Sequence, residues 1–185
     1  MPYVRCASCR LAAYTASRYS SRDRCPRCGG ALPGADESRE QGAPGEPIRR
    51  ALALARDQLG MDPTMLTEVR DNAEVIRNIV GDSAWLGVSE HDSFPLEETY
   101  CKRLLEGRIG LIVADAQRDD RVLDLAMTVG AGIGAYIGVP LRVDEARLYV
   151  LCCFAREARP ALGDADVRFL LGLGETVMAE LNGAA

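Results

Sequence analysis

The sequence predicts an α+β fold, in which an antiparallel sheet is flanked by helices and a small zinc ribbon precedes it. Three observations support this prediction. Two CxxC pairs fall within the first thirty residues, a stretch rich in Pro and Gly follows them, and helix-like and strand-like runs then alternate up to a last amphipathic helix. We therefore expect a zinc ribbon at 1–30, a flexible linker at 31–46 and an α+β domain at 47–185.

The composition is that of a globular protein with one ordinary domain and a small module. The chain has 185 residues, of which 48% are apolar and 26% are charged. It contains no run of about 18 apolar residues, and its first residues lack the apolar segment of a secretion signal. We expect a cytoplasmic protein without a membrane partner, in which the seven cysteines are reduced or bind metal.

The charge of the chain is unevenly distributed. The net charge is −5, but residues 1–30 hold six Arg and one Asp, a balance of +5, which leaves −10 for the remainder. A polyanion would therefore meet the first thirty residues, and the acidic remainder would repel it.

The four N-terminal cysteines have the spacing of a metal site. Cys6, Cys9, Cys25 and Cys28 form the pattern C-x2-C-x15-C-x2-C, which allows two short turns to present four thiolates in a tetrahedron. The segment resembles a zinc ribbon, and we predict one structural Zn²⁺ per chain. The alternatives are a redox CxxC pair, an iron site of the rubredoxin type and disulfides.

The first half of the domain predicts a helix, a hairpin and a second helix. Apolar residues recur at helical spacing over 47–59. Strand-like runs at 65–69 and 74–80 are joined at Asp71-Asn72, a plausible turn. A second helix begins at Pro95 and ends at Gly107.

The second half predicts three strands and a long helix. A short apolar strand covers 109–114, and an acidic loop and a helical piece at 122–127 follow it. Strands are expected at 135–143 and 147–154. The latter is apolar on both faces and should be central in the sheet. The last helix begins near Asp164, a suitable N-cap, and runs to Leu181.

Four blocks of the domain carry a resemblance to a known family. They are LEETYCKRLLEGRIGLIVADAQRDDRVLDL, IGAYIGVPLRV, RLYVLCCFAREAR and DADVRFLLGLGETV. In order and spacing they resemble a bacterial GAF domain over Ile48–Leu181. The resemblance implies a central antiparallel sheet with a small-molecule pocket on one face, and flanking helices that pair between subunits. GAF domains bind cyclic nucleotides, tetrapyrroles, amino acids or nothing known, so the ligand stays unidentified.

We expect this pocket between the helix that carries Tyr100 and Cys101, the loop at 115–121 and the strand that carries Tyr136, because a helix and a long irregular loop over a sheet leave a concavity. Carboxylates at its mouth would select a cationic or hydroxyl-bearing ligand. The alternatives are a solvated loop and a pocket filled by its own side chains. The candidate ligand-binding residues are Tyr100, Cys101, Asp115, Asp119, Arg121 and Tyr136.

The sequence argues against catalysis. Cys101 is interpreted as a buried small side chain, with a reactive thiol as the alternative, and Cys152 and Cys153 as packing residues on opposite faces of one strand. The single histidine, His91, has no triad partner signature near it. One GAF-fold enzyme reduces free methionine sulfoxide with cysteines, but segment 122–127, where its partner cysteine is expected, has none. We therefore expect no enzymatic activity.

The function expected from these observations is signal transduction. A structural zinc ribbon would accompany a GAF-type domain that senses a small molecule and signals through a partner protein, or through a homodimer formed by the helices at 47–59 and 164–181. One alternative is a transcriptional regulator whose ribbon binds nucleic acid through Arg18, Arg22 and Arg24. The other is a cysteine-dependent enzyme similar to free methionine sulfoxide reductase.

Overall fold

The computed structural model describes residues 3–5, 12–14 and 45–183, and the chain divides into two compact units at Glu46/Pro47. In the first unit, β1 (Tyr3–Arg5) pairs antiparallel with β2 (Ala12–Tyr14). The four cysteines predicted to bind zinc lie outside the described residues, as does the predicted linker up to residue 44. The boundaries of the ribbon and the linker therefore stay predictions.

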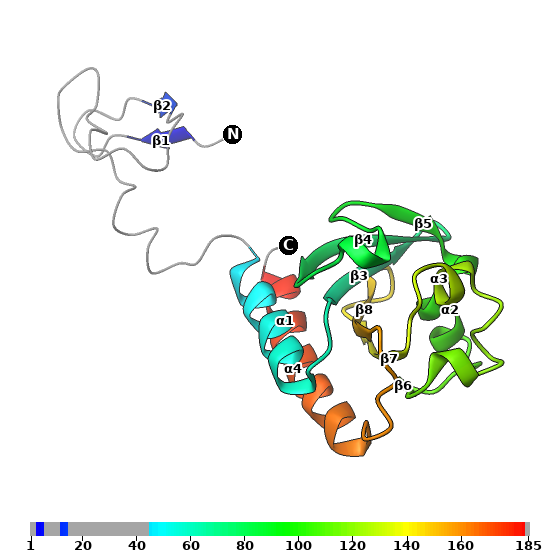
Figure 1. The fold of residues 1–185 in the computed structure, drawn as a ribbon. Helices are drawn as coiled ribbons and strands as arrows, with labels where there is room; N and C mark the ends of the chain where they lie inside the picture. Colours follow the sequence, from blue (N-terminus) through cyan, green and yellow to red (C-terminus); the bar gives the residue numbers. More distant parts are fainter. Residues whose placement is uncertain (1–2, 6–11, 15–44, 184–185) are drawn as a thin grey trace. The chain divides into compact units, whose positions relative to one another are not determined.

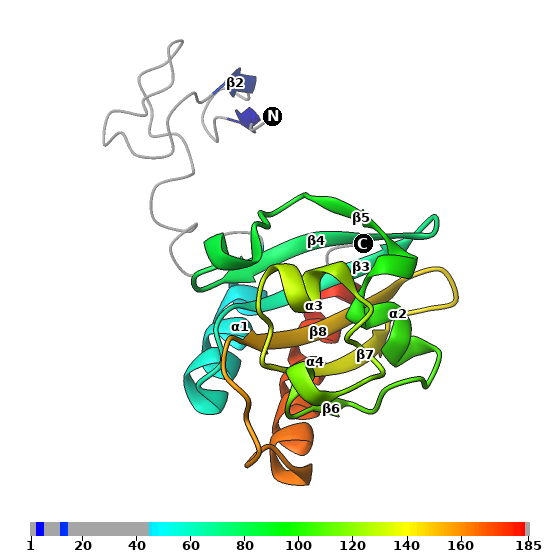
Figure 2. The same ribbon diagram turned by 45° about the vertical axis from the view of Figure 1, so that its right-hand side comes forward.

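The second unit is built on a six-stranded antiparallel sheet in the order β5-β4-β3-β8-β7-β6 (Figure 2). This order confirms that the strand with apolar residues on both faces, β8, is central. The strands are β3 (Thr64–Arg70), β4 (Ala73–Val80), β5 (Ser93–Pro95), β6 (Ile112–Val113), β7 (Ala135–Arg142) and β8 (Leu148–Ala155).

Two long helices cover one face of this sheet. They are α1 (Glu46–Leu59) and α4 (Asp164–Gly183), which lie side by side in Figure 1. Their apolar stripes bury Leu52 and Leu170 in one hydrophobic cluster that also contains Leu151 of β8. The helix α4 approaches β7 closely at Gly174, where an added Cβ would lie 2.6 Å from Cδ2 of Leu141. This layer confirms both predicted long helices.

Short elements and loops cover the opposite face. They include α2 (Tyr100–Leu105), α3 (Ala126–Gly130) and three 3₁₀ turns, namely η2 (Ala84–Leu86), η3 (Leu96–Glu98) and η4 (Ala116–Arg118). Because successive strand residues point to opposite faces, β8 contributes Cys152 to this second hydrophobic cluster and Cys153 to the first. Both thiols are fully buried, which confirms their assignment as packing residues.

The predicted hairpin is confirmed, and the predicted second helix is divided. Asp71 and Asn72 adopt φ values of 51° and 61°, the left-handed conformation that Asp and Asn tolerate in tight turns. The helix predicted from Pro95 is interrupted at Thr99, which has an extended backbone and whose side chain accepts a hydrogen bond from Lys102 N at 3.2 Å. This N-cap starts α2 one turn later than the apolar pattern indicated.

Three further boundaries differ from the predictions. The strand at 109–114 is reduced to β6, because the N–H of Ile109 donates to the Arg103 carbonyl at the end of α2. The helical piece at 122–127 is displaced to α3, because residues 119–125 form turns instead. The predicted N-cap Asp164 lies inside α4. The Gly163 carbonyl accepts from Val167 N, and Asp166 accepts from Gly163 N at 2.9 Å.

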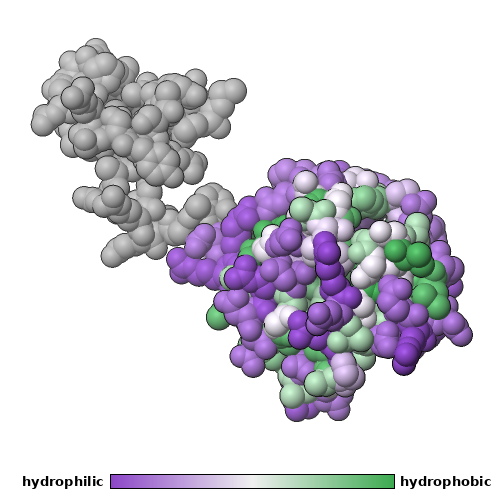
Figure 3. Space-filling view, in the orientation of Figure 1, coloured by the Kyte–Doolittle hydropathy of each residue, from purple (hydrophilic) through white to green (hydrophobic). Residues whose placement is uncertain are grey.

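The surface of the domain is mostly hydrophilic on the face shown in Figure 3. The large apolar side chains that are exposed among the described residues are Leu54, Val129 and Leu171. No helix within the described part of the chain is both long enough and apolar enough to span a membrane.

Candidate functional site

Polar side chains are buried where α2 crosses the sheet. Tyr100 and Cys101 of α2 and Tyr136 of β7 are all at most 1% exposed, and they belong to the second hydrophobic cluster. The start of α2 at Thr99 turns these two helix residues toward the sheet, and the alternation of β7 turns Tyr136 toward the helix. The structure therefore brings together three of the six side chains predicted to bind a ligand.

The Cys101 thiol is the centre of this cluster. It donates a hydrogen bond to Glu74 Oε1 on β4 at 3.2 Å. Thr67 Oγ1 on β3 lies 3.8 Å from the sulfur, and Tyr136 Oη lies 3.9 Å from it. Cys152 of β8 also lies within hydrogen-bonding reach of Cys101. Four of the six strands thus deliver a polar atom to one buried point. We call Thr67, Glu74, Cys101, Tyr136 and Cys152 the Cys101 cluster.

Three aromatic rings fill the space beside the Cys101 cluster. The ring centroids of Tyr100 and Tyr136 are 5.0 Å apart, and that of Phe154 on β8 lies 5.6 Å and 5.1 Å from them. These separations are those of favourable aromatic pairs. The Tyr136 ring lies over Gly138, two residues along the same strand, where an added Cβ would fall 2.6 Å from ring atom Cζ. Side chains therefore occupy the space between α2 and the sheet.

The environment raises the pKa of the Cys101 thiol and of the Tyr100 and Tyr136 phenols. The hydrogen bond with Cys152, followed by burial and the nearby Glu74 carboxylate, raises the pKa of Cys101 well above its usual value. Burial raises the pKa of Tyr136 well above its usual value, and that of Tyr100 to about 12. A nucleophilic cysteine needs a lowered pKa, so the full burial and raised pKa of Cys101 favour its interpretation as a buried small side chain.

The acidic loop carries the other three predicted residues, and two of its carboxylates pair with arginines of the same loop. Asp119 forms an ion pair with Arg121 at 2.6 Å, and the hydrogen bond from Arg121 lowers the pKa of the Asp119 carboxyl. Asp115 lies 3.9 Å from Arg118. Asp119 is close enough to raise the pKa of Tyr100 by its charge, but no hydrogen bond joins these three residues to the Cys101 cluster in the described structure. Their role as ligand-binding residues stays a prediction.

Two residues of α2, Tyr100 and Arg103, bind the segment 121–128, which packs over the site. Tyr100 Oη lies 2.7 Å from Thr128 Oγ1 on α3. Arg103, which is 5% exposed, donates to the Arg121 carbonyl at 2.5 Å and forms an ion pair with Asp124 at 2.7 Å. Because a buried arginine is costly without its partners, this contact fixes the loop against α2.

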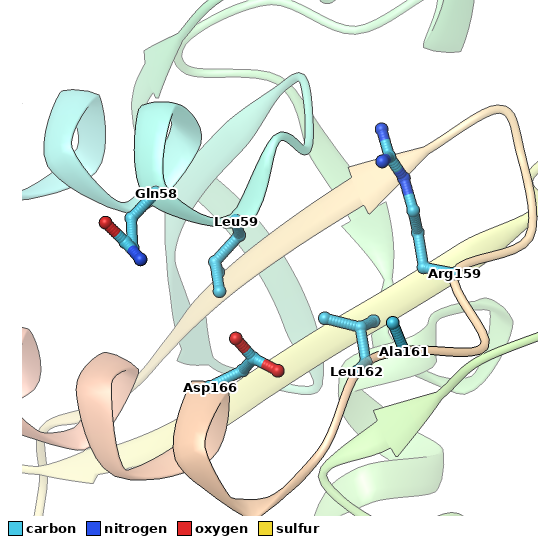
Figure 4. A pocket seen from close by; sticks show the side chains of 6 residues that line it. All are labelled: Gln58, Leu59, Arg159, Ala161, Leu162 and Asp166. Atoms are coloured by element: carbon cyan, nitrogen blue, oxygen red, sulfur yellow. The ribbon is translucent and has the colours of Figure 1, made fainter.

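Two hollows lie elsewhere on the domain. One, of about 140 Å³, lies between the end of α1 and the start of α4, where Figure 4 shows Arg159 opposite Asp166 and Gln58. The other, of about 350 Å³, is bordered by Trp85, by Arg156, whose guanidinium lies 5.1 Å from the Trp85 ring centroid, and by Arg159. Neither hollow is lined by any of the six predicted residues.

Sequence reasoning missed two polar members of the Cys101 cluster, Thr67 and Glu74, and treated Cys152 only as packing. A signal for Glu74 exists in the strand pattern, because Glu74 and Ile76 are two residues apart and therefore share the buried face of β4. Thr67 shares a face with Met65 of β3 for the same reason. Among the described residues, no three His, Cys, Asp or Glu side chains are placed to hold a metal ion.

The comparison with protein families gives one match. The family model described as "GAF domain" matches residues 44–181, which is most of the chain. No curated protein matches the chain.

Solved structures share the fold at low sequence identity. The phycocyanobilin-bound GAF domain of a cyanobacterial phytochrome is 12% identical with a TM-score of 0.61, over 78% of this chain and 87% of that one. The second GAF domain of DevS from Mycobacterium smegmatis is 19% identical with a TM-score of 0.55, over 77% and 96%. Free methionine-R-sulfoxide reductase from Neisseria meningitidis, in complex with its substrate, is 15% identical with a TM-score of 0.55, over 73% and 75%. These likenesses concern the fold alone.

Proposed function

Because this chain belongs to the GAF domain family, we propose that it is a regulatory protein whose domain binds a small molecule between α2, the 115–121 loop and the sheet. The observation that carries the proposal is the Cys101 cluster, because buried polar groups inside an apolar layer provide specific contacts for a ligand. Small molecules bound to the phytochrome GAF domain and to the Neisseria reductase support the same use of this fold. The proposed ligand-binding residues are Tyr100, Cys101, Asp115, Asp119, Arg121 and Tyr136.

A thermal-shift screen of nucleotides, amino acids and tetrapyrroles tests the proposed binding. A ligand that binds only the folded protein raises its unfolding temperature with saturation. Tyr136→Ala should weaken the binding of any hit, whereas Tyr149→Ala, on the opposite face of the sheet, should not. A hit that binds both variants as tightly as the parent would place the ligand elsewhere.

The proposed output runs through α1 and α4 of a homodimer or through a partner protein. Leu54 of α1 and Leu171 of α4 are 57% and 44% exposed, so these helices keep apolar surface beyond what the sheet covers. Helices paired between subunits can shift relative to one another when a ligand changes the domain. Light scattering at micromolar concentration should give the mass of a dimer, and a monomeric mass would contradict the homodimer and leave the partner protein as the proposed route.

The proposed zinc ribbon rests on the sequence. A segment of thirty residues with few apolar side chains buries too little surface to fold alone, and zinc binding supplies that free energy. We expect one zinc per chain, held by Cys6, Cys9, Cys25 and Cys28. Metal analysis should show that Cys25→Ser loses the zinc and that Cys153→Ser, in the core of the domain, retains it. Full zinc content in Cys25→Ser would refute the site.

A binding role is proposed in place of catalysis, because the raised pKa of Cys101 opposes a thiolate nucleophile. Nucleic-acid binding by the ribbon is the second candidate, and the balance of +5 over residues 1–30 favours it. A filter-binding assay on the whole chain separates the two, since phosphate contacts should weaken steeply with salt.

A further inference from the structure

Glu74 is the member of the Cys101 cluster that has a buried oxygen without a hydrogen-bond partner among the described residues. Glu74 is 7% exposed, and its Oε1 accepts the hydrogen bond from Cys101. Its Oε2 is buried and has no hydrogen-bond partner among the described residues. Burial of a carboxylate oxygen without a donor is unfavourable, so this oxygen is suited to accept a donor brought by another molecule.

Two other carboxylates near α2 already have cationic partners. Asp119 pairs with Arg121 at 2.6 Å and Asp124 pairs with Arg103 at 2.7 Å. Glu74 takes part in none of the ion pairs found in the described structure. Glu74 is therefore a buried carboxylate without a cationic partner among the described residues.

One aromatic side chain of this face, Tyr136, shares a contact with Glu74. The rings of Tyr100, Tyr136 and Phe154 lie within 5.0–5.6 Å of one another, and Tyr136 is joined to Glu74 through Cys101. The faces of aromatic rings attract cations, most strongly away from water. A buried carboxylate and an aromatic side chain that both contact Cys101 suit a positively charged nitrogen attached to an apolar or aromatic body.

We propose that the ligand of this domain carries a positively charged nitrogen and that Glu74 is its counter-ion. This inference rests on the proposed small-molecule binding and specifies the chemical class. The ligand nitrogen would donate to Oε2 while Cys101 continues to donate to Oε1, and the body of the ligand would displace part of the ring packing. For the ligand to enter, α2 would have to separate from α3. The contact between Tyr100 of α2 and Thr128 of α3 holds these two helices together.

Three probes with a phenylethyl body and different end groups test the charge requirement. They are 2-phenylethylamine, 2-phenylethanol and 3-phenylpropionate, added to the whole chain at equal ionic strength. In a thermal-shift titration the amine should raise the unfolding temperature most, the alcohol less, and the acid should have no effect. Glu74→Gln should abolish the preference for the amine, and Glu98→Gln, at an exposed carboxylate of η3, should retain it.

If Glu74→Gln does not fold, Glu74→Asp serves as the second variant, because aspartate keeps the carboxyl group on a side chain that is shorter by one methylene. The amine-induced shift should then be smaller than in the parent. Stabilisation by the acid equal to that by the amine, an undiminished amine shift in either Glu74 variant, or no stabilisation of the parent by any probe would overturn the role of Glu74. Binding of an anionic hit from the wider screen would leave the sensing function standing, whereas an absence of all binding would remove both.

Discussion

Replacing Gly138 by alanine should destabilise the domain, because the Tyr136 ring occupies the space that the new methyl group would need. The added Cβ would lie 2.6 Å from Tyr136 Cζ, whereas ordinary contacts of a Cβ begin near 3.4 Å. The ring cannot retreat freely, since it is fully buried between Tyr100 and Phe154. Close-packed interiors transmit such an overlap as strain.

Overpacking of this kind costs about 1–3 kcal/mol, and the confined position of the ring points to the upper half of that range. For a domain of this size, each kcal/mol lowers the unfolding temperature by roughly 2–4 °C, so Gly138→Ala should lower it by about 5–10 °C. Differential scanning calorimetry measures the change. The matched control is Gly172→Ala in α4, where an added Cβ meets nothing within 4 Å and alanine is favoured in a helix by about 1 kcal/mol.

A double-mutant cycle isolates the contact. In a Tyr136→Ala background the ring is gone, so Gly138→Ala should cost much less than in the parent. An unchanged unfolding temperature for Gly138→Ala, or the same loss in both backgrounds, would refute the packing described for the Tyr136 ring.

Three further perturbations probe the same account. Iodoacetamide at pH 8 should leave Cys101, Cys152 and Cys153 unmodified in the folded protein and alkylate all three in urea, as mass spectrometry of peptides would show, because they are buried and the pKa of Cys153 is raised to about 12. Burial also raises the pKa of Tyr100 to about 12, so the folded state holds this proton more tightly than the unfolded state does, and stability should fall as the pH rises from 10 to 12. Urea midpoints across that range measure the loss, and a constant midpoint would contradict it. Leu171→Glu should convert the proposed dimer into a monomer by light scattering, whereas a variant that keeps the dimeric mass would exclude α4 from the interface.

The fold was accessible from the sequence because local patterns determine it. The central position of β8 follows from apolar residues on both of its faces, and the hairpin follows from Asp71-Asn72 between two strand-like runs. The predicted element boundaries were wrong where local hydrogen bonds to backbone N–H groups override the periodicity of the apolar side chains. The N-cap at Thr99 divides the predicted helix, and the bond from Ile109 N to Arg103 O shortens the predicted strand.

The site was accessible only in part, because its members meet through strand pairing. Cys101 and Glu74 are 27 residues apart, and the sulfur reaches the carboxylate because the Cys101 side chain points to the sheet face that Thr67 and Glu74 share. The carboxylate at Asp119, by contrast, is neutralised by Arg121 two residues away, a partner visible in the sequence. Register between distant strands decides which polar residues share a buried point, and periodicity alone does not specify it.

Native mass spectrometry of the protein purified without denaturation from the cells that make it tests the central claim most directly. The proposed function predicts a dimer in which each chain carries one zinc and one small organic molecule, and collisional release of that molecule would give its mass and charge class. A spectrum in which folded chains carry zinc alone, at every protein concentration, would contradict small-molecule sensing and leave the domain as a module for contacts between proteins.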